Sequence, residues 1–412
     1  NLEGDYQKAN EAADQGLLIA RAAGLKQMEA YLLEELGTSL SNRGERKKAL
    51  DIYQQALALR SKDDPMGLAT TLGNIGTTYA YIGESAKALG YMEQVVKIMH
   101  DMGERQKEST TQSNMCVVYK DLGQFKKGLK VCNEALNTKR DLGDLSGEAT
   151  VLSNVGGNYA GLGAFQQALD VFQQSRAIHK RLNEREGEAI TTNNIGWTYG
   201  QLGEPEKAIE CYMQVLQYFR DAHNKYGVAT LLSNIGVSYA NLQDFRKALE
   251  FHLESLPLRL EKDDRSGRAI TLNNIANCYA KLGEPEKALE YYTEGIRLLR
   301  AMATQRQLAL SLKNVGSLYR DQGKIDKALE FLNEARTIST TIGDPSTHAA
   351  VLSELARLEL DRGNAIAARK LIEDAIASIE SVRTNLKSQQ LRASFLASVR
   401  KYYEIDIEAL MR

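Results

Sequence analysis

Residues 193–216 read NNIGWTYGQLGEPEKAIECYMQVL, and this stretch holds the features that decide the fold. A stripe of apolar and small residues comes first, followed by Gly203 and then by a second amphipathic stretch with Ala208 near its start. A glycine stops one helix, and a small residue lets the next helix pack closely against it. The stretch therefore predicts two helices that fold back on each other.

The same pattern recurs along the chain with a fixed period of 40 residues. One phase of the period is held by asparagines, namely Asn74, Asn114, Asn154, Asn194, Asn234, Asn274 and Asn314. A tyrosine follows each of them, from Tyr79 to Tyr319. One hairpin is too thin to enclose its own apolar face, so neighbouring hairpins must stack and bury it between them. We therefore predict an all-α fold, a right-handed α-solenoid of antiparallel helix pairs.

The period also divides the chain. We expect a leading half repeat at residues 1–25, nine helix pairs of about 40 residues at 26–386, and a final helix at 387–412. The polar run at 384–390 breaks the pattern, and the last helix carries Leu391, Phe395, Val399, Tyr402 and Tyr403. This helix is interpreted either as a cap on the open end of the stack or as a linker to a further segment.

Composition excludes several classes of partner. Lys and Arg number 52 against 53 Asp and Glu, a net charge of -1, which gives no overall case for binding nucleic acid or an anionic membrane. No apolar run is long enough to span a membrane. The four cysteines are scattered and fit neither a metal site nor a disulfide framework, which favours a reducing, cytoplasmic location.

The string at 193–216 and its echoes NIANCYAKLGEPEKALEYY (274–292) and NIGTTYAYIGESAKAL (74–89) resemble the tetratricopeptide repeat. Units of 40 residues exceed that family's usual length of about 34 and resemble the subtype found in kinesin light chains and spindle-orientation adaptors. The resemblance implies a superhelix whose inner groove, lined by the first helix of each unit, holds an extended peptide.

A second resemblance concerns the end of the chain. Residues 376–412 are similar to the segment that joins such arrays to a caspase-like CHAT protease domain in bacterial proteins. The resemblance implies an alternative function, the regulatory sensor arm of a protease whose catalytic domain is not in this chain.

The asparagines are the first candidate binding residues. Asn74 lies roughly 200° around its helix from the buried Gly76, at 3.6 residues per turn, so it points away from the core. In the resembling family this is the groove-lining face. An amide can both donate to and accept from a peptide backbone, so the ladder would hold main chain. The alternative is that each asparagine bonds a neighbouring helix and fixes the repeat geometry.

Trp197, the only tryptophan, occupies the same outward face in a register that Asn277 shares. Gly157 and Gly161, one unit earlier, are expected to leave the facing wall bare for a ligand. Aromatic anchors dominate interface energetics, so we interpret Trp197 as a binding residue. Burial between helices is the alternative.

The groove is expected to become basic toward its C-terminal end, where Lys281, Lys313 and Arg320 face outward with few compensating acids apart from Asp321. This predicts an acidic peptide ligand. A solvated charged surface is the alternative.

No constellation of residues suggests catalysis. The five histidines lie on different units without metal-ligand spacing, and no cysteine pairs in register with a histidine. We therefore predict no enzyme activity, no metal and no cofactor. The sequence favours a scaffold or adaptor that binds an extended peptide or partner protein, ahead of a passive spacer that oligomerises, and it leaves the oligomeric state open.

Overall fold

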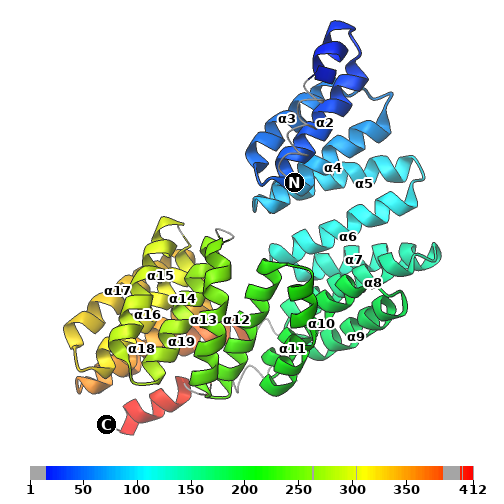
Figure 1. Cartoon of the computed structure of the whole chain (residues 1–412). Coiled ribbons are helices and arrows are strands. Elements are labelled where there is room, and N and C mark those ends of the chain that lie inside the picture. The colour runs from blue at the N-terminus through cyan, green and yellow to red at the C-terminus, as the bar shows by residue number, and fades with distance from the viewer. Residues whose placement is uncertain (1–14, 262–263, 303, 384–399, 401, 412) are drawn as a thin grey trace. The chain divides into compact units, whose positions relative to one another are not determined.

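The computed structural model describes residues 15–261, 264–302, 304–383, 400 and 402–411. All regular secondary structure in these residues is helical, and successive helices pair antiparallel (Figure 1). The predicted all-α class and helix pairing are confirmed. The expectations for residues 1–14, for the polar run at 384–390 and for Leu391, Phe395 and Val399 fall outside the described residues.

The chain divides into two units, residues 1–194 and 195–412, each described by itself. Unit 1 has a helix at 15–22 and then α2 (Lys26–Asn42), α3 (Arg46–Leu59), α4 (Pro65–Tyr81), α5 (Ser85–Asp101), α6 (Arg105–Asp121), α7 (Phe125–Asp141), α8 (Leu145–Gly161) and α9 (Phe165–Arg181). The boundary falls within α10 (Arg185–Gln201). Unit 2 continues with α11 (Pro205–Asp221), α12 (Lys225–Asn241), α13 (Phe245–Glu261), α14 (Arg265–Lys281), α15 (Pro285–Ala301), α16 (Gln305–Asp321), α17 (Ile325–Ile342), α18 (Pro345–Asp361), α19 (Ala365–Arg383) and a helix at 402–411.

Several first helices of the pairs begin with a side-chain cap. The Asp64 carboxylate accepts a hydrogen bond of 2.9 Å from the backbone N–H of Gly67 at the start of α4. The same cap starts four other first helices, with Asp144, Asn224, Asp264 and Asp344. Each cap satisfies one of the backbone donors that a helix start leaves free, which fixes where the helix begins.

The turn after each first helix needs a left-handed residue. Gly83 has φ 84°, which explains why a glycine recurs at this phase of the repeat. Gln243 stands where the repeat around α12 lacks that glycine, and it keeps the same backbone conformation with φ 62°. The turn geometry is therefore preserved even where the sequence signal is missing.

The core of each pair is built from one small and one large residue. Gly156 of α8 lies under the ring of Phe172 of α9, so closely that a Cβ would overlap the ring. Gly316 lies in the same way under the buried side chain of Leu332. Stacking such pairs makes a continuous core, which explains why single pairs cannot fold alone.

The helix at 402–411 closes the core of unit 2. Tyr402, Ile405 and Ala409 are buried in the cluster formed by the last helix pairs. The Tyr403 hydroxyl donates a 2.8 Å hydrogen bond to the Glu380 carboxylate of α19. This packing suits a capping helix, and the linker role stays a prediction.

Candidate functional site

Six of the seven repeated asparagines divide into two groups, and the seventh, Asn194, has an interaction partner. The amide nitrogen of Asn154 in α8 donates to the backbone oxygen and hydroxyl of Ser113 in α6, at 3.3 and 3.1 Å. The amide nitrogen of Asn314 in α16 donates to Asn277 Oδ1 in α14 at 3.1 Å. These two asparagines therefore join the first helices of neighbouring repeats. For them the alternative holds, in which the asparagine fixes the repeat geometry.

Four others keep their amides unused. Asn74, Asn114, Asn234 and Asn274 show no side-chain hydrogen bond within the residues that the structure describes. Asn114 is exposed, and the other three are half-buried. We call these four residues the open asparagines. They present free donors and acceptors on the first helices, two in each unit.

Trp197 is 42% exposed, so it lies outside the core, as its register predicts. The expected bare wall opposite it is not found in unit 1. The ring of Phe125 covers Gly161, and the side chain of Lys120 lies over Gly157. The sequence interpretation missed Phe125 because it considered only first-helix residues, whereas Phe125 starts the second helix α7. Lys120 lies on the first helix α6, and its long side chain reaches the next repeat. The binding role of Trp197 stays a prediction.

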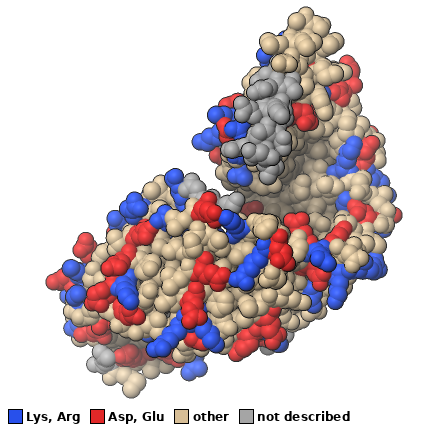
Figure 2. Space-filling view, viewed as in Figure 1, with Lys and Arg blue, Asp and Glu red and all other residues tan. Residues whose placement is uncertain are grey.

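The expected basic end of the groove is wrong at Arg320. Its guanidinium is 11% exposed and forms ion pairs with Asp321, Glu354 and Asp361. Glu354 and Asp361 lie on the next first helix, a compensation that the sequence interpretation did not foresee. Lys313 is half-buried and has an interaction partner, whereas Lys281 is exposed. Figure 2 shows positive and negative side chains interspersed over the visible face of each unit.

A pocket of about 210 Å³ lies among α12, α13 and α14 of unit 2. Val237, Ala240, Asn241 and Phe245 form its apolar side and rim, and His252, Asn274, Asn277, Cys278 and Lys281 complete it. Three predicted site residues on α14, Asn274, Asn277 and Lys281, thus meet in one cavity.

His252 is the pocket residue that sequence reasoning missed. Its side chain is 1% exposed, and its Nδ1 atom has no hydrogen bond within the described residues. Burial lowers the pKa of His252 to about 4, so the ring is neutral at physiological pH. A signal existed in the sequence, because His252 stands in the register of the core residues Tyr212 and Tyr292.

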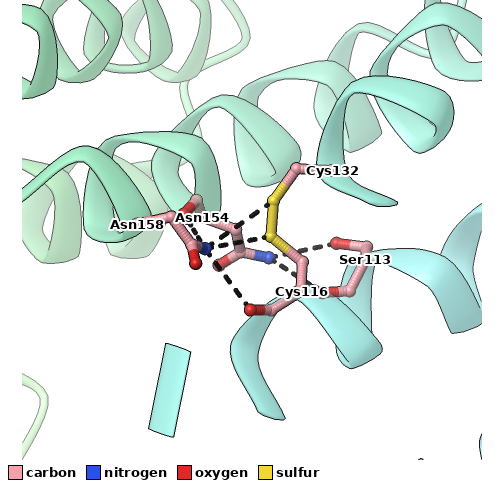
Figure 3. Close-up of a disulfide and its surroundings, with 5 residues drawn as sticks. All are labelled: Ser113, Cys116, Cys132, Asn154 and Asn158. Atoms are coloured by element: carbon pink, nitrogen blue, oxygen red, sulfur yellow. Dashed lines mark hydrogen bonds between the residues drawn. A yellow bond between two sulfur atoms is a disulfide. The ribbon is translucent and has the colours of Figure 1, made fainter. Parts of the chain in front are cut away.

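The pairing of Cys116 with Cys132 contradicts the expectation of separate cysteines. The structure joins the two as a disulfide between α6 and α7, with Cα atoms 5.4 Å apart (Figure 3). The two residues occupy the small and large core positions that Gly156 and Phe172 hold in the next pair, so the repeat itself brings them together. The argument from unpaired cysteines to a reducing compartment is therefore lost.

Asn158 of α8 lies over this cysteine pair. Its amide nitrogen donates to the Cys116 backbone oxygen and sulfur, both at 3.3 Å, while its own oxygen is buried without a hydrogen bond (Figure 3). The pair is thus enclosed between two repeats. Among the described residues it offers no exposed thiol to a ligand.

Cys278 and His252 line the same pocket, but they do not form a nucleophile and base. No hydrogen bond joins them in the part of the chain that the structure describes. Burial raises the pKa of the Cys278 thiol to about 11 and lowers that of His252, which opposes formation of a thiolate–imidazolium pair.

The described residues contain neither a metal-binding cluster nor a membrane-spanning helix. No group of three or more His, Cys, Asp or Glu side chains in them could hold a metal ion. None of their helices combines the length and the apolar character that crossing a membrane requires.

The sequence model of the tetratricopeptide repeat matches residues 28–100, 107–181, 147–221, 227–301 and 306–382. These matches cover most of the chain. The chain belongs to the tetratricopeptide repeat family. The predicted family is thereby confirmed, and repeats of this kind make a protein-interaction scaffold. No curated protein sequence matches the chain.

Solved structures share the fold at low identity. The apo quorum sensor NprR from B. thuringiensis is 17% identical, with a TM-score of 0.63 over 88% of this chain and 99% of that chain. A Rap protein complexed with competence and sporulation factor is 14% identical, with a TM-score of 0.53 over 83% of this chain and 99% of that chain. A STAND protein with a tetratricopeptide repeat sensor from Pyrococcus horikoshii is 15% identical, with a TM-score of 0.59 over 82% of this chain and 54% of that chain.

Proposed function

We propose that this chain is a non-catalytic scaffold that binds an extended peptide segment of a partner protein along its first helices. The observation that carries the proposal is the set of open asparagines. A half-buried amide without an intramolecular partner gains a full hydrogen bond when a peptide backbone reaches it. Two open asparagines in each unit, at one phase of the repeat, suit a main chain that runs across neighbouring repeats of that unit.

The proposed ligand is a peptide rather than a folded domain surface. Extended peptides offer one backbone donor and one acceptor per residue, which a ladder of amides can meet without reading sequence. Trp197 adds an exposed aromatic side chain on the first helix α10, three residues after Asn194. The neighbouring Rap structure contains a bound factor, which accords with a ligand held by this fold.

The test is selection of random linear peptides displayed on phage against the intact chain. Asn234→Ala and Asn274→Ala should each weaken the selected peptides by about 2- to 12-fold, the value of one net hydrogen bond. Asn333→Ala is the matched control, because Asn333 is an exposed amide on the second helix α17. Peptides that bind all three variants as well as the parent chain would contradict the proposal.

A further inference from the structure

The pocket among α12, α13 and α14 is rich in hydrogen-bond donors. Asn277 Oδ1 accepts from the Tyr292 hydroxyl and from the Asn314 amide, so its own amide nitrogen is left to donate. Asn274 is one of the open asparagines, and Lys281 contributes an ammonium group at the mouth. No residue that lines the pocket carries a carboxylate.

His252 points to an absent ligand. A polar atom buried without a hydrogen bond is destabilising, so native structures rarely leave one without a partner. The equivalent core position elsewhere holds apolar or phenolic side chains, such as Leu332 and Tyr292. A neutral imidazole carries one N–H donor, which can turn toward an acceptor that enters the pocket.

The charge at the mouth is peculiar to this pair of repeats. Lys281 is the only cation at its register, where other first helices carry Asp121, Asn241, Asp321 and Asp361 among others. Arg320, the other predicted basic residue nearby, is already neutralised by three carboxylates. Of the three predicted basic residues, Lys281 is therefore the one for which the described residues show no ion pair.

We infer that the pocket binds one acidic side chain, Asp or Glu, of the peptide, with its carboxylate held by Lys281, His252, Asn274 and Asn277. The inference rests on the proposed function, because a peptide is taken to carry the carboxylate. Val237, Ala240 and Phe245 contact the short apolar stem of that side chain. The pocket thereby fixes which residue of a peptide lies at α14, whereas the other three open asparagines hold main chain of any sequence.

A small probe tests the pocket without any peptide. The chain is labelled with ¹³C-histidine and titrated with sodium propionate, with neutral propionamide and with sodium chloride at matched ionic strength. The His252 signal is assigned by its loss in His252→Leu, since Leu332 shows that leucine fits this register. Propionate should shift the His252 signal saturably and leave His223, which lies outside this pocket, unmoved.

The controls separate recognition of the carboxylate from filling of the cavity. Lys281→Gln should weaken propionate by about threefold, the modest value expected of an exposed ammonium. Binding should strengthen as the pH falls from 7 toward about 6, where propionate stays ionised, because a carboxylate beside His252 favours its protonated form, and His252→Leu should abolish this change. Lys281 and Cys278, both on α14, are the other titratable groups that line the pocket. Equal shifts with propionamide, or no saturable shift with propionate, would overturn the inference.

Selected peptides distinguish the source of the carboxylate and separate the two proposals. An amidated peptide with a central Glu should bind better than its Gln analogue, and Lys281→Gln should remove the difference. A preference for a free C-terminus over the acidic side chain would overturn the side-chain assignment. Peptides that depend on Asn234 but not on Glu or Lys281 would overturn the pocket and leave the scaffold. Propionate binding without any selected peptide would uphold the pocket and reject the scaffold.

Discussion

Gly128 of α7 lies directly beneath the side-chain oxygen of Asn158 in α8, with no room for a Cβ between them. Other second helices carry a buried alanine at this register, as at Ala168 and Ala208. The repeat that contains α7 has Gly128 in place of this alanine because the fully buried amide of Asn158, in the next repeat, occupies the space.

Gly128→Ala should destabilise the protein by about 1–3 kcal/mol through overpacking. Asn158→Thr, the residue type found at the equivalent Thr198, should restore stability in the double variant. Gly90→Ala is the control, because Gly90 lies mid-helix with nothing near its Cβ position. The control should stabilise the protein by about 0.5–1 kcal/mol. Equal effects of Gly128→Ala and Gly90→Ala on urea unfolding would refute this account.

A buried ion pair ties α3 to α2. Arg60 and Glu34 meet at 2.7 Å with side chains only 6% and 7% exposed, and Arg60 also reaches Asp64. Arg60→Met should cost about 3–5 kcal/mol, because it leaves the Glu34 charge buried without its partner. Arg105→Met removes an ion pair to Asp141 that is more than half exposed, and should change stability by less than about 0.5 kcal/mol. Chemical unfolding measures the loss of stability in each variant. Similar losses in Arg60→Met and Arg105→Met would show that burial does not set the value of the ion pair.

His252 makes stability depend on pH. The folded chain keeps this ring neutral down to a pKa of about 4, whereas a histidine in the unfolded chain titrates near about 6.5. The unfolded state therefore binds the extra proton between these values. The contribution is fully present above about pH 6.5 and is lost as the pH falls toward 4, by about 3 kcal/mol in total.

The measurement is unfolding of the parent chain and of His252→Leu at pH 7, 6, 5 and about 4. The difference in stability between the two should change across this window, because titrations common to both chains cancel. A difference that stays constant with pH would show that the ring is accessible to protons in the folded state.

The 40-residue period predicted the fold well, because the same apolar pattern recurs in successive repeats. On α4 the residues Ala69, Leu72 and Gly76 form a buried stripe, since each repeat places it against the same partners. The site was harder to predict, because it depends on contacts between neighbouring repeats. Neither the Glu354 and Asp361 that surround Arg320 nor the Phe125 that covers Gly161 is visible from one helix alone. The cysteine pair could have been found, since its spacing matches the paired core registers.

Trp197 should report binding directly, because it is the only tryptophan and is 42% exposed. A peptide that covers the indole should shift its emission to shorter wavelength and reduce quenching by acrylamide. Binding elsewhere would leave both unchanged. The titration uses the peptides selected on phage, and an emission typical of a fully enclosed indole before any peptide is added would already contradict the exposed position.

The two groups of asparagines should separate stability from binding. Asn314→Ala removes a hydrogen bond to Asn277 between neighbouring first helices, so it should lower stability by about 0.5–1.5 kcal/mol. Asn114→Ala removes an exposed amide without a side-chain bond among the described residues, so stability should stay within about 0.5 kcal/mol. Peptide affinity should fall more in Asn114→Ala than in Asn314→Ala if the open asparagines hold the ligand, because only Asn114 has its amide available.

Both quantities are measured on the same preparations, by thermal unfolding and by titration with one selected peptide. If Asn114→Ala unfolds earlier than Asn314→Ala, the ladder is structural throughout. If neither variant changes affinity while the Asn234 and Asn274 variants do, the peptide is held by unit 2 alone, where the pocket beside Lys281 would then be its anchor.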